Sequence, residues 1–168
     1  MNFEEIIQNS KASIEKDDLR ILLPILASIN PKVFLEIGTW KGYSAEMWLK
    51  AFNLNTFVTI EKEGMEIKDA NPPDNISTEL YYCWGSDSHN PKVQERVKIV
   101  APFDTLFIDG DHSLEGVKQD FEMYSPLVRK GGIIVFHDCV YHADKTEEVD
   151  ILWQEIKLKY PYIEIKVG

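Results

Sequence analysis

Residues 33–44 read Val-Phe-Leu-Glu-Ile-Gly-Thr-Trp-Lys-Gly-Tyr-Ser, and the order of secondary-structure elements is clearest in this stretch. Val33–Ile37 is a short, mostly apolar run typical of a buried strand, and helical periodicity follows directly after Gly42. Gly38 permits a tight turn, and Gly42 lets the backbone or a ligand approach closely at the start of the helix. The stretch therefore predicts a strand, a turn and a helix in immediate succession.

The same alternation of strand and helix patterns continues on both sides of this stretch. Further strands are predicted at Phe57–Ile60, Leu80–Cys83, Thr105–Ile108 and Ile133–Phe136, with a last candidate at Tyr162–Val167. Helical spacing occurs at Asp17–Leu26, Ala45–Phe52, Leu114–Val128 and Val149–Tyr160. We expect Pro24 to kink the first of these helices or to mark its true start. The alternation predicts an α/β fold, with a doubly wound, mostly parallel sheet covered on both faces.

Composition sets the class of protein. The chain has 168 residues, and 18 Lys plus Arg against 28 Asp plus Glu give a net charge of −10. This length predicts a single domain (1–168), with an N-terminal helical segment (1–31) before a Rossmann-like core (32–168). The excess of acids argues against a nucleic-acid partner. The longest apolar stretch, Ile21–Ile29, is far shorter than the ~20 residues that span a membrane, and the N-terminus lacks a secretion signal. We therefore expect a soluble, cytoplasmic protein.

Acidic residues follow nearly every predicted strand, where parallel sheets bind their ligands. Glu61 comes 23 residues after Gly38, close to the spacing expected for an acid that binds ribose hydroxyls. Trp40 stands where a pyrophosphate-binding turn needs a third glycine, so the dinucleotide fingerprint fails. A glycine turn with a solvated Glu61, and Asp111 as a simple helix cap, remain the alternative interpretations. Together the strand ends favour a ribose-bearing ligand.

The pattern Glu36-x-Gly38-x-x-x-Gly42, with Glu61 and Gly85-Ser86-Asp87, resembles the class I S-adenosylmethionine-dependent methyltransferases from Lys32 to Asp138. The resemblance implies strand order 3-2-1-4-5. It also implies that the glycine turn holds the methionine part of the cofactor, Glu61 the ribose, and Ser86 or Asp87 the adenine. The cofactor residues implied in this way are Glu36, Gly38, Thr39, Gly42, Tyr43, Glu61, Gly85, Ser86, Asp87 and Asp109. Acids suit this ligand because it carries a sulfonium and an ammonium group.

Two further motifs, Asp109-Gly-Asp111-His112 and His137-Asp138, are similar to the metal-dependent branch that methylates sugars and antibiotics, and more distantly to catechol O-methyltransferase. That resemblance implies a divalent metal, magnesium or manganese, held by Asp109, His137 and Asp138. The branch usually has Asp, Glu or Asn at the position of His137, and imidazole suits manganese, iron or zinc better than magnesium. It also implies Asp111 as the first candidate for the catalytic base and His112 as the second.

The expected function is metal-assisted O-methylation of a small hydroxylated molecule, such as a sugar or a catechol-like compound. A metal-independent methyltransferase and a non-catalytic adenosine- or nucleotide-binding module are the alternatives. The related fold normally continues past a sixth strand, whereas this chain reaches Gly168 just after its last candidate. We expect a truncated C-terminal strand, which either pairs directly with the fifth strand or leaves an open sheet edge for another subunit, and we hypothesise a homodimer. His89 and His142 are expected to be ordinary surface residues.

Overall fold

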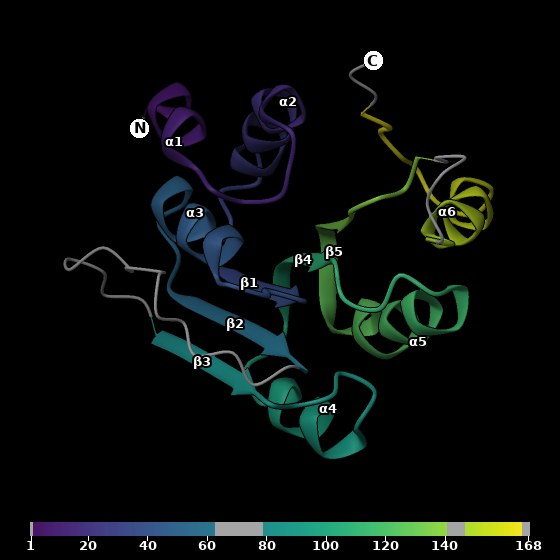
Figure 1. Ribbon diagram of the computed structural model, residues 1–168. Coiled ribbons are helices and arrows are strands. Elements are labelled where there is room, and N and C mark those ends of the chain that lie inside the picture. The colour runs from purple at the N-terminus through teal and green to yellow at the C-terminus, as the bar shows by residue number, and fades with distance from the viewer. Residues whose placement is uncertain (1, 63–78, 141–146, 166–168) are drawn as a thin grey trace.

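The computed structural model describes residues 2–62, 79–140 and 147–165 and contains one five-stranded sheet in the order β3-β2-β1-β4-β5 (Figure 1). All neighbouring strands run parallel. The strands are β1 (Val33–Ile37), β2 (Thr56–Glu61), β3 (Glu79–Trp84), β4 (Phe103–Ile108) and β5 (Val128–Phe136). The predicted class and strand order are therefore confirmed.

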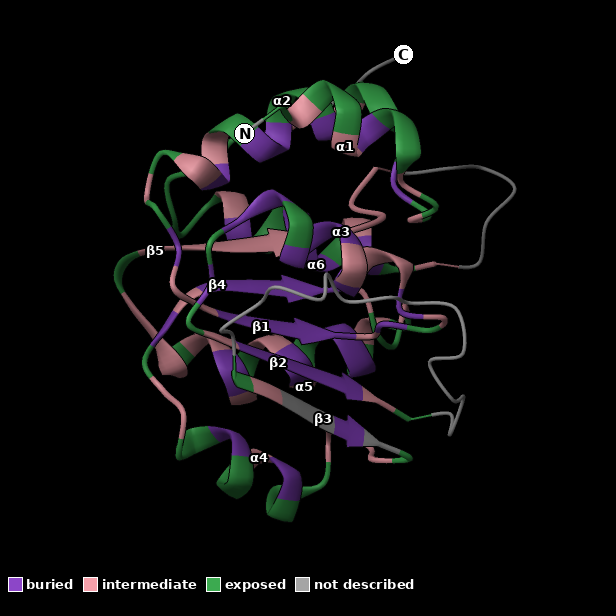
Figure 2. Cartoon of the chain, turned by 90° about the vertical axis from the view of Figure 1, so that its left-hand side faces the viewer, coloured by how far each residue is buried: buried purple, intermediate pink, exposed green. Residues whose placement is uncertain are grey.

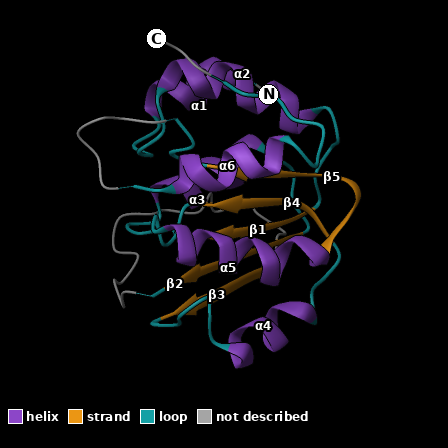
Figure 3. Ribbon diagram, turned by 90° about the vertical axis from the view of Figure 1, so that its right-hand side faces the viewer, coloured by secondary structure: helices purple, strands orange, loops and turns teal. Residues whose placement is uncertain are grey.

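Helices cover both faces of the sheet, as Figure 3 shows. On one face lie α1 (Phe3–Asn9), α2 (Lys16–Ala27) and α3 (Tyr43–Ala51), and on the other lie α4 (Pro91–Lys98), α5 (Leu114–Tyr124) and α6 (Val149–Lys157). None of the helices in the described ranges has the length and apolar content that crossing a bilayer requires. Figure 2 shows the central strands buried and the outer surfaces of α1 and α2 exposed, so the core lies between the helical layers and the sheet.

Side chains along β1 alternate between the two halves of the core. Phe34 packs into the cluster formed with α1, α2 and α3, whereas Leu35 and Ile37 pack into the cluster on the face of α4, α5 and α6. Successive side chains of a strand point to opposite faces, so Glu36 lies on the side of Phe34, toward α3. This alternation determines where the side chain of Glu36 lies relative to the candidate site.

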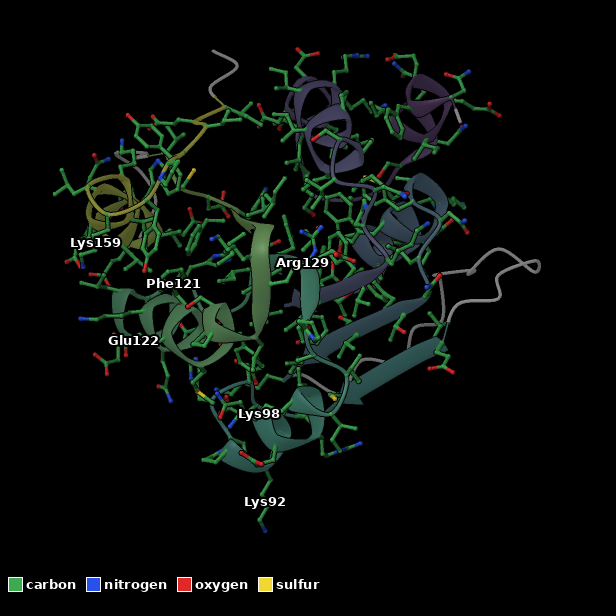
Figure 4. All side chains as sticks on the ribbon, turned by 180° about the vertical axis from the view of Figure 1, so that it is seen from behind. Lys92, Lys98, Phe121, Glu122, Arg129 and Lys159 are labelled. Carbon is green, nitrogen blue, oxygen red and sulfur yellow. The ribbon has the colours of Figure 1, made fainter. Side chains whose placement is uncertain are left out.

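Several elements differ from their predicted bounds. Helix α2 runs through Pro24, and α4, which was not predicted, begins with the N-cap Asn90. Its Lys92 points away from the sheet in Figure 4. Helix α5 ends at Tyr124, and a single 3₁₀ turn (η1, Ser125–Leu127) leads to β5, which starts five residues earlier than predicted.

The register of β4 against β5 shifts between Phe103 and Thr105, opposite the part of β5 that contains Gly131 and Gly132. Residues 161–165 form no strand, so the expected C-terminal strand is wrong over this stretch. The rest of that candidate lies outside the described residues.

One carboxylate joins three strands at their amino ends. Asp104 Oδ2 accepts hydrogen bonds from the backbone nitrogens of Lys32 (2.6 Å) and Val33 (2.8 Å), and its Oδ1 accepts one from Arg129 Nε (2.5 Å). Arg129 is labelled in Figure 4 beside β5. Burial alone would raise the pKa of Asp104, but these hydrogen bonds outweigh it and lower the pKa. Asp104 thereby holds β1, β4 and β5 together at the edge opposite the acidic strand ends.

Candidate functional site

A cavity of about 550 Å³ opens at the carboxyl ends of the strands. Its walls come from the segments after β1, β2, β3 and β4, and from residues 12–14 between α1 and α2. This volume lies in the range of small-molecule sites. Eight of the predicted site residues line it: Gly38, Thr39, Tyr43, Glu61, Ser86, Asp87, Asp109 and Asp111. Glu36, Gly42 and Gly85 are not among the described residues that line the cavity.

The glycine turn after β1 packs directly on the end of β4. Gly38 has φ +81°, and a Cβ added there would stand 2.0 Å from the carbonyl oxygen of Asp109. Glu61 holds the same turn from the other side, because its Oε2 accepts hydrogen bonds from the backbone nitrogens of Thr39 (3.0 Å) and Trp40 (2.6 Å). The predicted ribose-binding acid therefore also fixes the shape of the glycine turn.

Glu36 lies behind the cavity rather than in its wall. It is fully buried, and its carboxylate accepts hydrogen bonds from Trp48 Nε1 (3.0 Å) and Thr59 Oγ1 (3.0 Å). Burial raises the pKa of Glu36 to about 7 in spite of the hydrogen bonds it accepts. These contacts join β1, β2 and α3, so the structure gives Glu36 a supporting position and no contact surface in the cavity.

The motif residues after β4 and β5 form one cluster beside the cavity. Asp109 Oδ1 lies 3.1 Å from His112 Nε2 and 3.2 Å from His137 Nδ1, and the same His137 nitrogen lies 3.0 Å from Asp138 Oδ2. Ligand atoms of Asp109, His137 and Asp138 all lie within 4.8 Å of one another, close enough for one metal ion. The structure therefore brings together the three predicted metal ligands, with His112 against them.

The charges of this cluster are balanced between imidazoles and carboxylates. Burial alone would lower the pKa of His137, but its hydrogen bonds with Asp109 and Asp138 raise the pKa to about 10. Burial works the other way on Asp109, yet the hydrogen bonds from His112 and His137 leave its pKa below the ordinary value. In the absence of a cation, His137 is therefore protonated at neutral pH.

The two candidate bases point to different places. Asp111 Oδ1 accepts the backbone nitrogen of Ser113 (2.9 Å), and this contact is the main reason why the pKa of Asp111 is lowered. His112 lies in the metal-ligand cluster, with Nε2 4.0 Å from Asp138 Oδ2 and Nδ1 3.8 Å from Glu147 Oε1. The backbone nitrogen of Glu148 donates to the carbonyl of His112 (2.8 Å) and fixes this turn. Of the two candidate bases, His112 is the one whose side chain lies beside the predicted metal ligands Asp109 and Asp138.

An acid of the N-terminal segment also acts on the cluster. Asp18, in the first turn of α2, interacts electrostatically with His137, and its Oδ1 is buried without a hydrogen-bond partner among the described residues. Burial raises the pKa of Asp18. From the sequence, Asp18 is predicted only as part of a helix start, because nothing in its local pattern relates it to β5.

His89 is not the surface residue that was expected. Its side chain is 18% exposed and lines the cavity, with Nε2 3.3 Å from Oδ1 of the fully buried Asp120. Burial raises the pKa of Asp120 to about 6; the side chain of Ser88 and the charge of His89 oppose this rise, and Asp111 and Asp87 add to it. Neither role was visible in the sequence, since His89 and Asp120 are 31 positions apart. His142 lies outside the described residues.

Comparison with known proteins identifies the family. Residues 35–139, more than half of the chain, match the family model described as "Methyltransferase domain". The chain belongs to this methyltransferase family. The resemblance predicted from the strand-end motifs is therefore confirmed at the level of the family.

Relatives place the methyltransferase among known folds. It is 29% identical, over 141 residues, to an uncharacterised protein of Acanthamoeba polyphaga mimivirus; the match covers 79% of this chain and spans only 57% of that relative. The O-methyltransferase TomG of Streptomyces achromogenes, solved with S-adenosylmethionine, has 18% identity and a TM-score of 0.65 over 88% of this chain and 71% of its own. An O-methyltransferase of Bacillus cereus, solved with S-adenosylhomocysteine, has 20% identity and a TM-score of 0.63 over 94% and 79%. At these identities the two structures establish the fold.

The MycE methyltransferase of mycinamycin biosynthesis, solved with magnesium, S-adenosylhomocysteine and mycinamycin VI, is 25% identical with a TM-score of 0.51. The match covers 64% of this chain and 28% of MycE. The methyltransferase therefore shares its fold with a solved structure that contains magnesium.

Proposed function

We propose that this methyltransferase transfers a methyl group from S-adenosylmethionine to a hydroxyl of a small molecule, with a divalent metal beside the acceptor. One observation carries the proposal: Asp109 lines the cavity and also belongs to the cluster with His137 and Asp138. A donor in the cavity and an acceptor at the cluster would therefore meet across a single side chain. Contact between donor and acceptor is the main requirement of an in-line transfer.

The cavity suits a cationic cofactor. Acids outnumber lysines among the residues that line it: Glu61, Asp87, Asp109 and Asp111 against Lys41 and Lys62. This excess favours a ligand whose sulfonium and ammonium groups are positive. Following the family pattern, the turn at Gly38 takes the methionine part, Glu61 the ribose and Ser86–Asp87 the adenine. The complexes of TomG and the Bacillus cereus enzyme with this cofactor or its product support the assignment.

The cluster fits a divalent metal. Asp109 and Asp138 offer carboxylate oxygens and His137 an imidazole nitrogen, all within 4.8 Å of one another. Two carboxylates with an imidazole favour manganese, iron or zinc over magnesium. When bound, such an ion supplies Lewis acidity that lowers the pKa of an acceptor hydroxyl. His137 must give up its proton to become a ligand, so binding is coupled to proton release.

We propose His112 rather than Asp111 as the base that takes the acceptor proton, which reverses the order given by the resemblance. His112 Nε2 lies next to Asp109 and faces Asp138, so it is beside any hydroxyl held at the cluster. The contact with Asp109 raises the pKa of His112, which stabilises the imidazolium that a proton acceptor becomes. Glu147, near Nδ1, adds to this stabilisation. Asp111 is a weaker base because its pKa is lowered.

The acceptor that fits this arrangement is a small molecule with neighbouring hydroxyls, of the sugar or catechol type. A metal-independent O-methyltransferase is the second candidate, and a specific observation favours it. His137 already lies within 3.2 Å of the carboxylates of both Asp109 and Asp138 without any cation. In that case His137 would stay protonated between the two carboxylates, and His112 in its neutral form would take the proton of the acceptor hydroxyl.

Calorimetric titration of S-adenosylhomocysteine and of Mn²⁺ tests both halves of the proposal. We expect the wild-type chain to bind each, and we expect Asp138→Asn to lose Mn²⁺ while it keeps S-adenosylhomocysteine. No binding of S-adenosylhomocysteine at millimolar concentration would refute the cofactor assignment. Full methyl transfer in the presence of a strong chelator would refute the metal and leave the second candidate.

A matched variant tests the donor set itself. His137→Asp replaces the imidazole by the carboxylate that the metal-dependent branch usually carries at this position. We expect it to gain affinity for Mg²⁺ relative to Mn²⁺, because magnesium prefers oxygen ligands. An unchanged preference between the two ions would show that His137 is not a ligand.

A further inference from the structure

Asp120 of α5 is an unusual residue for the interior of this fold. It is fully buried, and neither of its carboxylate oxygens makes a hydrogen bond of good geometry with a described residue. Burying a carboxylate is costly unless a partner compensates for the lost water. Part of the compensation comes from the Ser88 side chain, and part from His89, whose Nε2 lies 3.3 Å from Asp120 Oδ1. The fold therefore retains a charged group at a position where an apolar residue would be easier to bury.

The contact fixes the orientation of the His89 ring. Nε2 also lies 3.2 Å from the carbonyl oxygen of Gly116, an acceptor, so this nitrogen carries a hydrogen and faces α5. The other nitrogen, Nδ1, lies 3.7 Å from Asp87 Oδ1 in the cavity wall. Asp87 Oδ1 in addition accepts the backbone nitrogen of His89 at 3.0 Å. One ring thus connects a buried acid of α5 to an acid that faces the cavity.

A second contact holds the neighbouring residue from the same helix. The hydroxyl of Tyr124, one turn after Asp120, donates to the carbonyl oxygen of Ser88 at 2.7 Å. Residues 86–89 all line the cavity at the end of β3. Helix α5 therefore sets the position of this wall through two consecutive residues, one of them by a charged contact and the other by a neutral one.

We propose that His89, held by Asp120, is a positioning residue that sets the Ser86–His89 segment for the adenosyl end of the cofactor. The proposal rests on the proposed function, because it assigns that end of the ligand to the segment after β3. Purine edges and ribose hydroxyls form hydrogen bonds in fixed directions, so small displacements of Asp87 weaken binding. The metal cluster at β4 and β5 does not depend on this contact.

The test is calorimetric titration of S-adenosylhomocysteine and, separately, of Mn²⁺ with the wild-type chain and a set of variants. His89→Ala and Asp120→Asn each remove one partner, and His89→Gln keeps a donor near Asp120. Asn90→Ala is the matched control, because Asn90 caps α4 in the same connection through Lys92 and does not line the cavity. It lowers stability without touching the proposed contact.

We expect His89→Ala and Asp120→Asn each to weaken S-adenosylhomocysteine binding about tenfold, the loss typical of one charged hydrogen bond. The double variant should be no weaker than either single one, and His89→Gln should recover part of the loss. Affinity for Mn²⁺ should stay unchanged throughout, and Asn90→Ala should bind S-adenosylhomocysteine like the wild type.

Two outcomes separate this proposal from the proposed function. Wild-type protein that does not bind S-adenosylhomocysteine would refute both. Wild-type protein that binds, with His89→Ala and His89→Gln of equal affinity to it, would refute the positioning role alone. A loss in Asn90→Ala as large as in His89→Ala would likewise refute it, because general destabilisation would then explain the effect. The His89 variants decide the matter even if Asp120→Asn does not fold.

Discussion

Glu36→Gln should remove a pH dependence of stability that the wild-type chain carries in its core. Burial raises the pKa of Glu36 from 4.5 to about 7 in the folded chain. A carboxyl group with a raised folded pKa stabilises the fold while it is protonated, and this contribution is lost as the pH rises from the unfolded to the folded value. A difference of this size corresponds to about 3 kcal/mol between pH 4.5 and pH 8.

Glutamine keeps the shape of the side chain and an oxygen that accepts from Trp48 Nε1, while its amide can donate to Thr59. It has no proton to lose. We therefore expect the variant to gain stability relative to the wild type by about 3 kcal/mol as the pH rises through this window. For a chain of this length that corresponds to a gain of about 6–12 °C in the unfolding temperature.

Urea unfolding of both proteins at half-unit steps from pH 4.5 to pH 8 measures the difference directly. Contributions from Asp120, His112 and His137 occur in both proteins and cancel in the comparison. Glu95→Gln, on the exposed side of α4, is the control and should follow the wild-type curve. Parallel curves for Glu36→Gln and the wild type would refute the argument, because they would mean that Glu36 is ionised in the core at no cost.

Three other predictions follow from the site. Gly38→Ala should lose at least about 2 kcal/mol of unfolding free energy and all affinity for S-adenosylhomocysteine, since its Cβ would overlap the backbone of Asp109. Thermal unfolding measures the first loss and calorimetry the second, and a stable variant that binds would contradict the geometry. Mn²⁺ affinity should rise up to about tenfold per pH unit from pH 6.5 toward 10, because His137 must lose a proton; titrations in buffers of different ionisation enthalpy would show no proton release if this were wrong. Ser113→Ala, which removes the N-cap contact with Gly116, should cost about 1 kcal/mol in urea unfolding and leave Mn²⁺ affinity unchanged.

The sequence predicted the sheet well because its strands are short apolar runs that follow one another through turns. The order of the strands came from the family resemblance. The meeting of Asp109 with His137 and Asp138 agrees with it, since β4 and β5 are neighbours and the carboxyl ends of parallel strands share one edge. The alternation of side chains along a strand also predicts which side of the sheet Glu36 faces, although the motif comparison placed Glu36 among the cofactor-binding residues. Counting from Phe34 in β1 places Glu36 toward α3, as the structure does, and away from the cavity.

Other parts of the site depend on contacts that no local pattern encodes. His89 reaches Asp120 because α5 packs beside the end of β3, and the rotation of that helix is set by its core residues. His112 and Asp111 are neighbours in sequence, yet the turn into α5 sends one to the metal-ligand cluster and the other to the cavity. Helix α4 had a readable signal in the Asn90 cap, but its short, polar sequence hid the apolar pair Val93 and Val97.

The hydrogen bonds of Asp104 bear on which parts of the chain can vary in sequence. They fasten the starts of β1, β4 and β5, while the predicted metal ligands Asp109, His137 and Asp138 follow the opposite ends of β4 and β5. The contacts that hold the strands together therefore lie at the amino ends of the sheet, and the candidate site lies at its carboxyl ends. The loops at the carboxyl ends can therefore change in sequence, and with them the acceptor that binds, without loss of the Asp104 contacts that keep the strands aligned.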